Sequence, residues 1–233
     1  MAVLSLGFGL GMNSFRERIR AVDGSVSEED IGRAFDLFRG TFRAVMSQHC
    51  AATSCLSRAH EGMRDLGVVC GARLELLDDV IVAHLASGRP LYYRGIRRVH
   101  AGSATSIWFE RCSSTTPAPL LDSLPATGPS GPRFKDGRAR DELLPHGLVN
   151  NIVQAVARDV CVHLEAELES KGVRVAFSVH DSLVAFCDAN DESWERAHAT
   201  MAHVMGSMPQ SLSAIDGIPL ASEAEQNVKE RFG

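Results

Sequence analysis

A regular run of apolar residues between Val149 and Leu168 constrains the fold most strongly. These residues recur at steps of three and four, the spacing of one face of a long α-helix. Gly172 marks the end of that helix, and two β-rich runs follow it. A second helix over about 192–205 and a short strand near "GIPLAS" come next. Helix, hairpin, helix and strand in this order predict an α+β fold in which an antiparallel sheet carries its helices on one face.

Two further elements are indicated in the N-terminal half. Ser27 with Asp30 three residues later resembles a helix capping box, and apolar residues then continue at helical spacing to Val45. Residues 71–100 alternate more like strands, and "SGR" at 87–89 has the composition of a tight turn. The sequence therefore predicts a helix from Ser27 to about Val45 and, further along, a hairpin around this turn.

A proline-rich segment divides the chain into two halves. Five of the nine prolines fall within residues 113–132, among Ser, Thr and Gly. Such a composition is typical of a flexible loop and is not needed for a packed core. The segment does not by itself establish two domains, because 233 residues with 45% apolar composition can form either one sizeable core or two subdomains.

Composition argues against several classes of protein. No stretch approaches the roughly 20 apolar residues of a membrane span, and the N-terminus lacks the order of a secretory signal, so we expect a soluble, cytoplasmic protein without a membrane partner. Six cysteines occur without a CxxC pair, which argues against a disulfide framework. One stretch could be considered as a metal cluster, but its spacing matches no common zinc site and favours a structural role. Its candidate ligands are His49, Cys50, Cys55 and His60.

A local basic patch contrasts with the overall charge of the chain. The formal net charge is -5, which argues against binding to nucleic acid through bulk positive charge. The stretch "SGRPLYYRGIRR" nevertheless holds four arginines and both tyrosines without an acid. Either a nucleic-acid surface or a solvated strand edge explains this composition. The arginines are Arg89, Arg94, Arg97 and Arg98.

An ionisable pair interrupts the two β-rich runs, since His180 and Asp181 lie within "SVHDSLVAF". A turn aspartate satisfied by backbone N–H groups is the usual explanation for such a residue. However, "GLVNNIVQAVARDV" followed by "VAFSVHDSLVAF" resembles the end of a bacteriophage-type family A DNA polymerase, the DNA polymerase I type. "LSLGFGLGMNSF", "LASGRPLYYRG" and "GIPLASEAEQNVKERFG" resemble its fingers helix, the following hairpin and its C-terminal tail. The resemblance is collinear over nearly the whole chain and fails only in the proline-rich segment.

The resemblance implies an incomplete polymerase fold, with an antiparallel palm sheet, packed helices and a helical fingers portion. Residues 1–70 would be the remainder of the fingers helices, and 71–112 a hairpin region leading back to the palm. Residues 113–140 would form the flexible loop. Residues 141–233 would be the palm segment with the His-Asp hairpin and the C-terminal tail.

The same resemblance assigns a catalytic site to the hairpin tip. Asp181 would be a metal ligand, and His180 would face the primer terminus. Nucleotidyl transfer of this kind uses two Mg²⁺ ions that carboxylates must hold. Ser182 stands where the family usually has a glutamate, so one auxiliary negative charge is missing.

Contacts to DNA and nucleotide are also implied by position. Asn150 and Gln154, four residues apart on the long helix, would contact primer and template in the minor groove, where amides meet base acceptors without reading sequence. Two further DNA-binding candidates are His146, which stands where the family usually has Arg or Lys, and Arg89. The candidates for nucleotide binding are Leu4, Phe8, which stands where the family usually has tyrosine, and Gly9.

Other parts of the family's machinery have no counterpart here. The first metal-binding aspartate, the triphosphate-binding Arg and Lys, the thumb and the exonuclease would all precede Met1. We therefore expect a C-terminal polymerase subunit that acts on primer-template DNA and dNTP and shares two Mg²⁺ ions with an N-terminal partner subunit. A catalytically silent DNA-binding or scaffold module is the first alternative. An unrelated hydrolase or metal site is the second.

Overall fold

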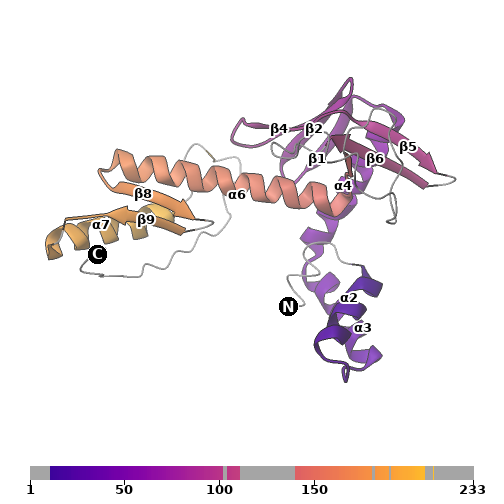
Figure 1. The fold of residues 1–233 in the computed structure, drawn as a ribbon, viewed down its shortest axis with the longest axis horizontal. Coiled ribbons are helices and arrows are strands. Elements are labelled where there is room, and N and C mark those ends of the chain that lie inside the picture. Colours follow the sequence, from indigo (N-terminus) through magenta and orange to yellow (C-terminus); the bar gives the residue numbers. More distant parts are fainter. Residues whose placement is uncertain are drawn as a thin grey trace, which may run out of the picture. The chain divides into compact units, whose positions relative to one another are not determined.

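The computed structural model describes residues 11–101, 104–110, 140–179, 182–188, 190–207 and 212. They belong to two compact units, which divide the sequence between Val153 and Gln154. The described part contains five helices, and its strands pair antiparallel in every sheet (Figure 1). The α+β prediction is therefore confirmed.

The first unit opens with three helices, and Ser27 fixes the start of the second. Its hydroxyl oxygen accepts a hydrogen bond from the Asp30 backbone N–H at 3.1 Å, as the capping prediction requires. Phe15, Ile31 and Phe38 form a small core between the first two helices. The three helices are α2 (Met12–Val22), α3 (Glu28–Thr41) and α4 (Arg43–Glu61).

The prediction of one continuous helix from Ser27 to Val45 is wrong. At Phe42 the backbone leaves the helical region, with φ −103° and ψ 48°, and α4 starts at the next residue. Gly40 weakens the preceding turn, because glycine costs a helix interior roughly 0.5–1 kcal/mol relative to alanine. The Phe42 ring still packs 4.7 Å from that of Phe38, so the apolar spacing continues across the break.

Four strands follow in a sheet of order β1-β2-β3-β4. The predicted hairpin around "SGR" is confirmed, because His84 pairs with Pro90 and Ile81 with Tyr93 across it. Gly88 supplies a positive φ of +82° in its turn, a conformation that favours glycine. The strands are β1 (Asp65–Val69), β2 (Ala72–Leu77), β3 (Val80–His84) and β4 (Pro90–Tyr93).

A second sheet of order β5-β6-β7 joins the first through the segment after β4. The Arg94 carbonyl accepts a hydrogen bond from the Glu110 N–H at 2.8 Å, and the Gly95 carbonyl accepts one from Arg140 Nε at 3.3 Å. These bonds hold the connection between the two sheets in place. The strands are β5 (Arg97–Ala101), β6 (Ala104–Glu110) and β7 (Arg140–Glu142).

Helix α6 (Pro145–Ser170) begins in the first unit and ends in the second. Its end at Gly172 is confirmed in detail. The N–H groups of Gly172 and Val173 donate to the carbonyls of Glu169 and Leu168 at 2.9 and 3.0 Å, and Gly172 has φ +83°. This pattern is a Schellman motif, in which a left-handed glycine stops the helix.

The second unit continues with a hairpin and a helix, as the sequence predicted. They are β8 (Arg174–Val179), β9 (Ser182–Phe186) and α7 (Asp191–Met205). Buried residues of α6 and α7 form one core, and alternate hairpin residues such as Val175 and Leu183 pack against it. The strand predicted near "GIPLAS" and the proline-rich segment lie outside the described residues.

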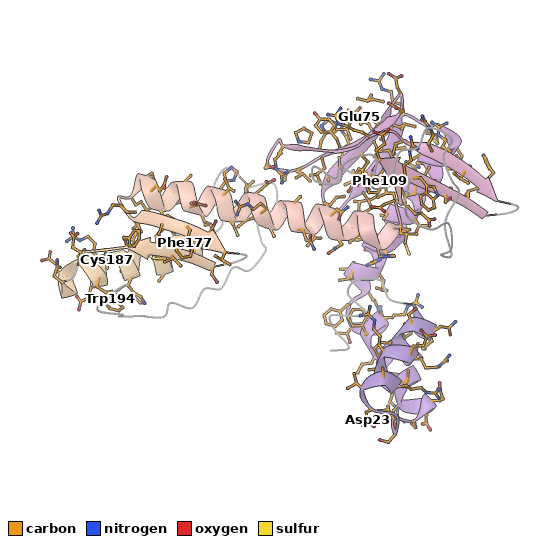
Figure 2. All side chains as sticks on the ribbon, viewed as in Figure 1. Asp23, Glu75, Phe109, Phe177, Cys187 and Trp194 are labelled. Atoms are coloured by element: carbon orange, nitrogen blue, oxygen red, sulfur yellow. The ribbon has the colours of Figure 1, made fainter. Side chains whose placement is uncertain are left out.

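The hairpin presents its other residues to solvent, and these are mostly apolar. Phe177 and Phe186 are 54% and 58% exposed, and Val179 and Val184 are exposed with them. Figure 2 marks Phe177 on this hairpin. Among the described residues of the second unit, one face of this hairpin is therefore apolar and exposed.

Candidate functional site

The hairpin connection holds the two residues predicted to do chemistry. Val179, the last residue of β8, pairs with Ser182, the first residue of β9. The connection between these paired positions is therefore His180 and Asp181, which themselves lie outside the described residues. Both flanking strands are tied by backbone pairing and by packing on the core of the second unit, so the connection starts and ends at fixed points.

Ser182 is exposed at the start of β9. A serine hydroxyl can accept and donate hydrogen bonds but carries no charge. The position that would follow the metal-binding aspartate thus adds no carboxylate. Among the described residues, no cluster of three or more His, Cys, Asp or Glu side chains could hold a metal ion.

Three predicted DNA contacts lie on α6. His146 is exposed in its first turn, Asn150 is half-buried one turn later, and Gln154 is exposed four residues beyond Asn150. The buried positions of the same segment, Leu148 and Ile152, lie between them in sequence. The structure thus places the polar residues beside the apolar stripe, as the helical spacing predicted.

Sequence reasoning missed a neighbouring amide that has a structural role. Asn151 Nδ2 donates a hydrogen bond to the Tyr93 hydroxyl at 3.3 Å. Burial raises the pKa of Tyr93, and the bond from Asn151 offsets this in part. The alternation of β4, which turns Tyr93 inward and Tyr92 outward, was the signal that could have separated the two tyrosines.

The basic patch has one well-defined feature on β4. Tyr92 is 53% exposed, and the Arg94 guanidinium carbon lies 4.9 Å from the centre of its ring, within the range of a cation–π contact. Arg89 is exposed one residue before the strand begins. The patch therefore consists of an aromatic ring on β4 and two arginines that flank the strand.

The possible metal cluster of α4 gains no support. Cys50 and Cys55 lie on this helix, but the first is exposed and the second is buried. Burial raises the pKa of the Cys55 thiol, which disfavours the thiolate that a metal would bind. The His60 ring packs edge-on against His100 at 4.2 Å, so one of the other candidates contacts β5.

Sheet β1–β4 also contains a His–Glu pair that the sequence did not indicate. His84 Nε2 and Glu75 Oε1 are 2.6 Å apart across β2 and β3. The bond to His84 holds the pKa of Glu75 below its usual value, with Arg73 and Arg64 contributing in the same direction. This pair has the geometry of a cross-strand contact that stabilises the sheet.

The predicted nucleotide contacts lie outside the described residues. They are Leu4, Phe8 and Gly9.

Comparison with known proteins finds no matching family model and no significantly similar curated protein or solved structure. In the described part of the chain, no helix combines the length and apolar character needed to cross a membrane.

Proposed function

We propose that this chain is the C-terminal part of a family A DNA-directed DNA polymerase. It would carry out template-dependent nucleotidyl transfer together with a partner chain. One observation carries the proposal: α6, the β8–β9 hairpin and α7 form a unit whose hairpin connection consists of His180 and Asp181. This arrangement supports the resemblance, because an antiparallel hairpin with helices packed on one face is what the resemblance implies for the palm.

The proposed metal ligand lies between the two strands of this hairpin in the sequence. These strands pair with each other, and one face of the hairpin packs on the core of the second unit. Asp181 would hold Mg²⁺, and His180 would lie toward the primer terminus. When bound, the ions would activate the primer hydroxyl and stabilise the charge of the triphosphate. Because Ser182 adds no charge, the partner chain would supply further carboxylates in our proposal.

The uncovered hairpin face supports the need for a partner. Contiguous exposed apolar residues often mark a protein interface, and an unpaired strand edge favours the addition of a strand. Phe177 and Phe186 are both more than half exposed on this face. A partner that supplies further palm residues would cover apolar surface that otherwise remains in water.

DNA would be held by polar residues of α6. Asn150 and Gln154 are amides, which can donate to the base acceptors present in every minor groove. His146, exposed in the first turn, and Arg89 would add contacts to the phosphate backbone. Such contacts position the nucleic acid without selecting its sequence.

A silent DNA-binding module is the second candidate. Ser182 and Phe8 favour it, since both depart from the residue types that the resemblance implies at a working site. This module would bind primer-template DNA, but its partner complex would not extend a primer. The two candidates differ in chemistry and share the DNA-binding surface.

The discriminating experiment is reconstitution. The chain is co-expressed with the product of a neighbouring reading frame that carries a palm aspartate motif and the start of a fingers helix, and the purified complex is tested for primer extension. We expect Mg²⁺-dependent extension by the complex and none by either chain alone. Robust extension by this chain alone would contradict the split arrangement. A stable complex that binds DNA and never extends it would favour the silent module.

A further inference from the structure

The exposed ring of Tyr92 on β4, with the Arg94 guanidinium over it, has no role in the proposed catalytic site. Tyr92 lies opposite Val82 in the β3–β4 ladder, and its neighbour Tyr93 is buried on the other face. Strand alternation therefore places Tyr92 on the face opposite Tyr93. More than half of the Tyr92 surface remains accessible even though the Arg94 guanidinium lies over its ring.

The position of Arg94 is fixed by the second sheet. Its carbonyl accepts the Glu110 N–H at 2.8 Å, and the next residue, Gly95, adopts φ +64°. Arg140, whose side chain is fully buried, donates to the Gly95 carbonyl at 3.3 Å and lies 3.5 Å from the Glu110 carboxylate. Glu110, which bonds to this turn from β6, is therefore engaged with Arg140, and the carbonyls of Arg94 and Gly95 both accept hydrogen bonds.

The sequence around this pair contains arginines and no acid, although the chain as a whole has a net charge of -5. No Asp or Glu occurs from Val80 to Phe109, and Arg89 and Arg94 flank β4 within that interval. An exposed ring next to guanidinium groups is the combination that proteins use for single-stranded nucleic acids. Bases stack on the ring, and cations contact the phosphates.

We propose that Tyr92 and Arg94 form a stacking platform for the bases of a single-stranded nucleic acid, with Arg89 contacting its phosphates. The inference deepens the proposed function and rests on it only for the class of ligand. A duplex is a poorer fit, since its bases are already stacked on each other. An acidic peptide would engage the arginines but would leave the exposed ring unused.

The test measures binding of a fluorescein-labelled oligothymidylate of about 20 nucleotides to the full chain without any partner, by fluorescence anisotropy at low salt. Tyr92→Ala should weaken binding by about 5- to 150-fold, since stacking is worth about 1–3 kcal/mol per base. Tyr92→Phe, which keeps a ring, should bind nearly as the original chain does. Arg33→Ala on α3 is the control, because it removes another exposed arginine, one that pairs with Glu29.

The salt dependence of binding separates base stacking from phosphate contact. Arg89→Ala should lower the slope of log affinity against log salt by about 0.7, the value expected for one phosphate contact on a single strand. Tyr92→Ala should weaken binding with the slope unchanged. Thermal unfolding of each variant shows whether the fold is retained.

Three results would overturn the platform: Tyr92→Ala binding like the original chain, a blunt duplex of the same length binding as tightly, or polyglutamate competing as well as unlabelled oligothymidylate. These outcomes are independent of catalysis. If this chain binds single strands but the partner complex never extends a primer, the polymerase proposal fails and the platform stands. If the complex extends primers but this chain binds no single strand, the platform fails and the polymerase proposal stands.

Discussion

At Gly95 the backbone has a φ of +64°, and an added Cβ would lie 2.4 Å from the side chain of Glu110. Gly71 has a similar φ of +77°, but its Cβ would meet nothing within 4 Å. Alanine at Gly71 therefore adds only the left-handed strain, roughly 1–2 kcal/mol. Alanine at Gly95 adds a clash as well, because Glu110 cannot move without leaving the buried Arg140.

We predict that Gly95→Ala lowers the free energy of unfolding of the first unit by at least about 1 kcal/mol more than Gly71→Ala does. Urea unfolding followed by Trp108 fluorescence, in a Trp194→Phe background, reports this unit. Shortening Glu110 to alanine first should reduce the difference between the two glycine positions. Equal losses at both glycines in the original background would show that the clash is not there.

Glu75 gives a pH-dependent prediction. The bond to His84 lowers the pKa of this carboxyl from its ordinary value of 4.5. A lowered folded-state pKa stabilises the fold above the ordinary value, and this contribution is lost as the pH falls through the folded-state pKa. Glu75→Gln should therefore lower the urea midpoint of the Trp108 transition near neutral pH, and the deficit should shrink on acidification. A deficit that grows toward low pH would contradict the assigned cause.

At the scale of the elements, the two faces of α6 can be compared by one substitution. Val160 is buried in the core of the second unit, whereas Val162 on the same helix is 45% exposed. Val160→Ala removes buried methyl groups and leaves a cavity, so we expect a loss of about 2 kcal/mol. Val162→Ala should change stability by less than about 0.5 kcal/mol. Urea unfolding followed by Trp194 fluorescence in a Trp108→Phe background measures the stability of both variants. Stability losses of similar size would contradict the assignment of Val160 to the core and Val162 to the surface.

Elements with local sequence signals could be predicted. The cap at Ser27 and the stop at Gly172 depend on residues within one helical turn, so short patterns were sufficient. The break at Phe42 could not be found in this way, because the apolar spacing continues through it. The pairing of β5, β6 and β7 also escaped prediction, since β7 lies beyond the proline-rich segment and pairs with β6 across a long sequence separation.

Only part of the candidate site followed from the sequence. Helical spacing predicted that Asn150 and Gln154 lie on one long helix, and the structure has them there. Composition indicated a basic patch, but it could not show that Tyr92 faces out and Tyr93 faces in, or that Arg94 lies over the Tyr92 ring. Those facts depend on strand register, which is set by pairing between distant residues.

At the scale of the whole molecule, the two units carry different parts of the proposed activity. The first unit holds Arg89, Tyr92 and Arg94, which would contact nucleic acid. The second holds the hairpin whose connection carries His180 and Asp181. In the proposal, the partner chain would complete the site by adding further carboxylates and cations.

Asp181→Asn in the reconstituted complex tests the central claim most directly. The change keeps the size of the side chain and removes the charge that would hold Mg²⁺, so folding and primer-template binding should be retained while extension falls to nearly zero. Asp188→Asn is the matched control, because Asp188 follows β9 as an exposed carboxylate bonded to Arg174 at 3.3 Å. This control should extend primers normally. Full primer extension by the Asp181→Asn complex, with this chain shown to be present, would contradict the assignment of the hairpin connection as the catalytic site.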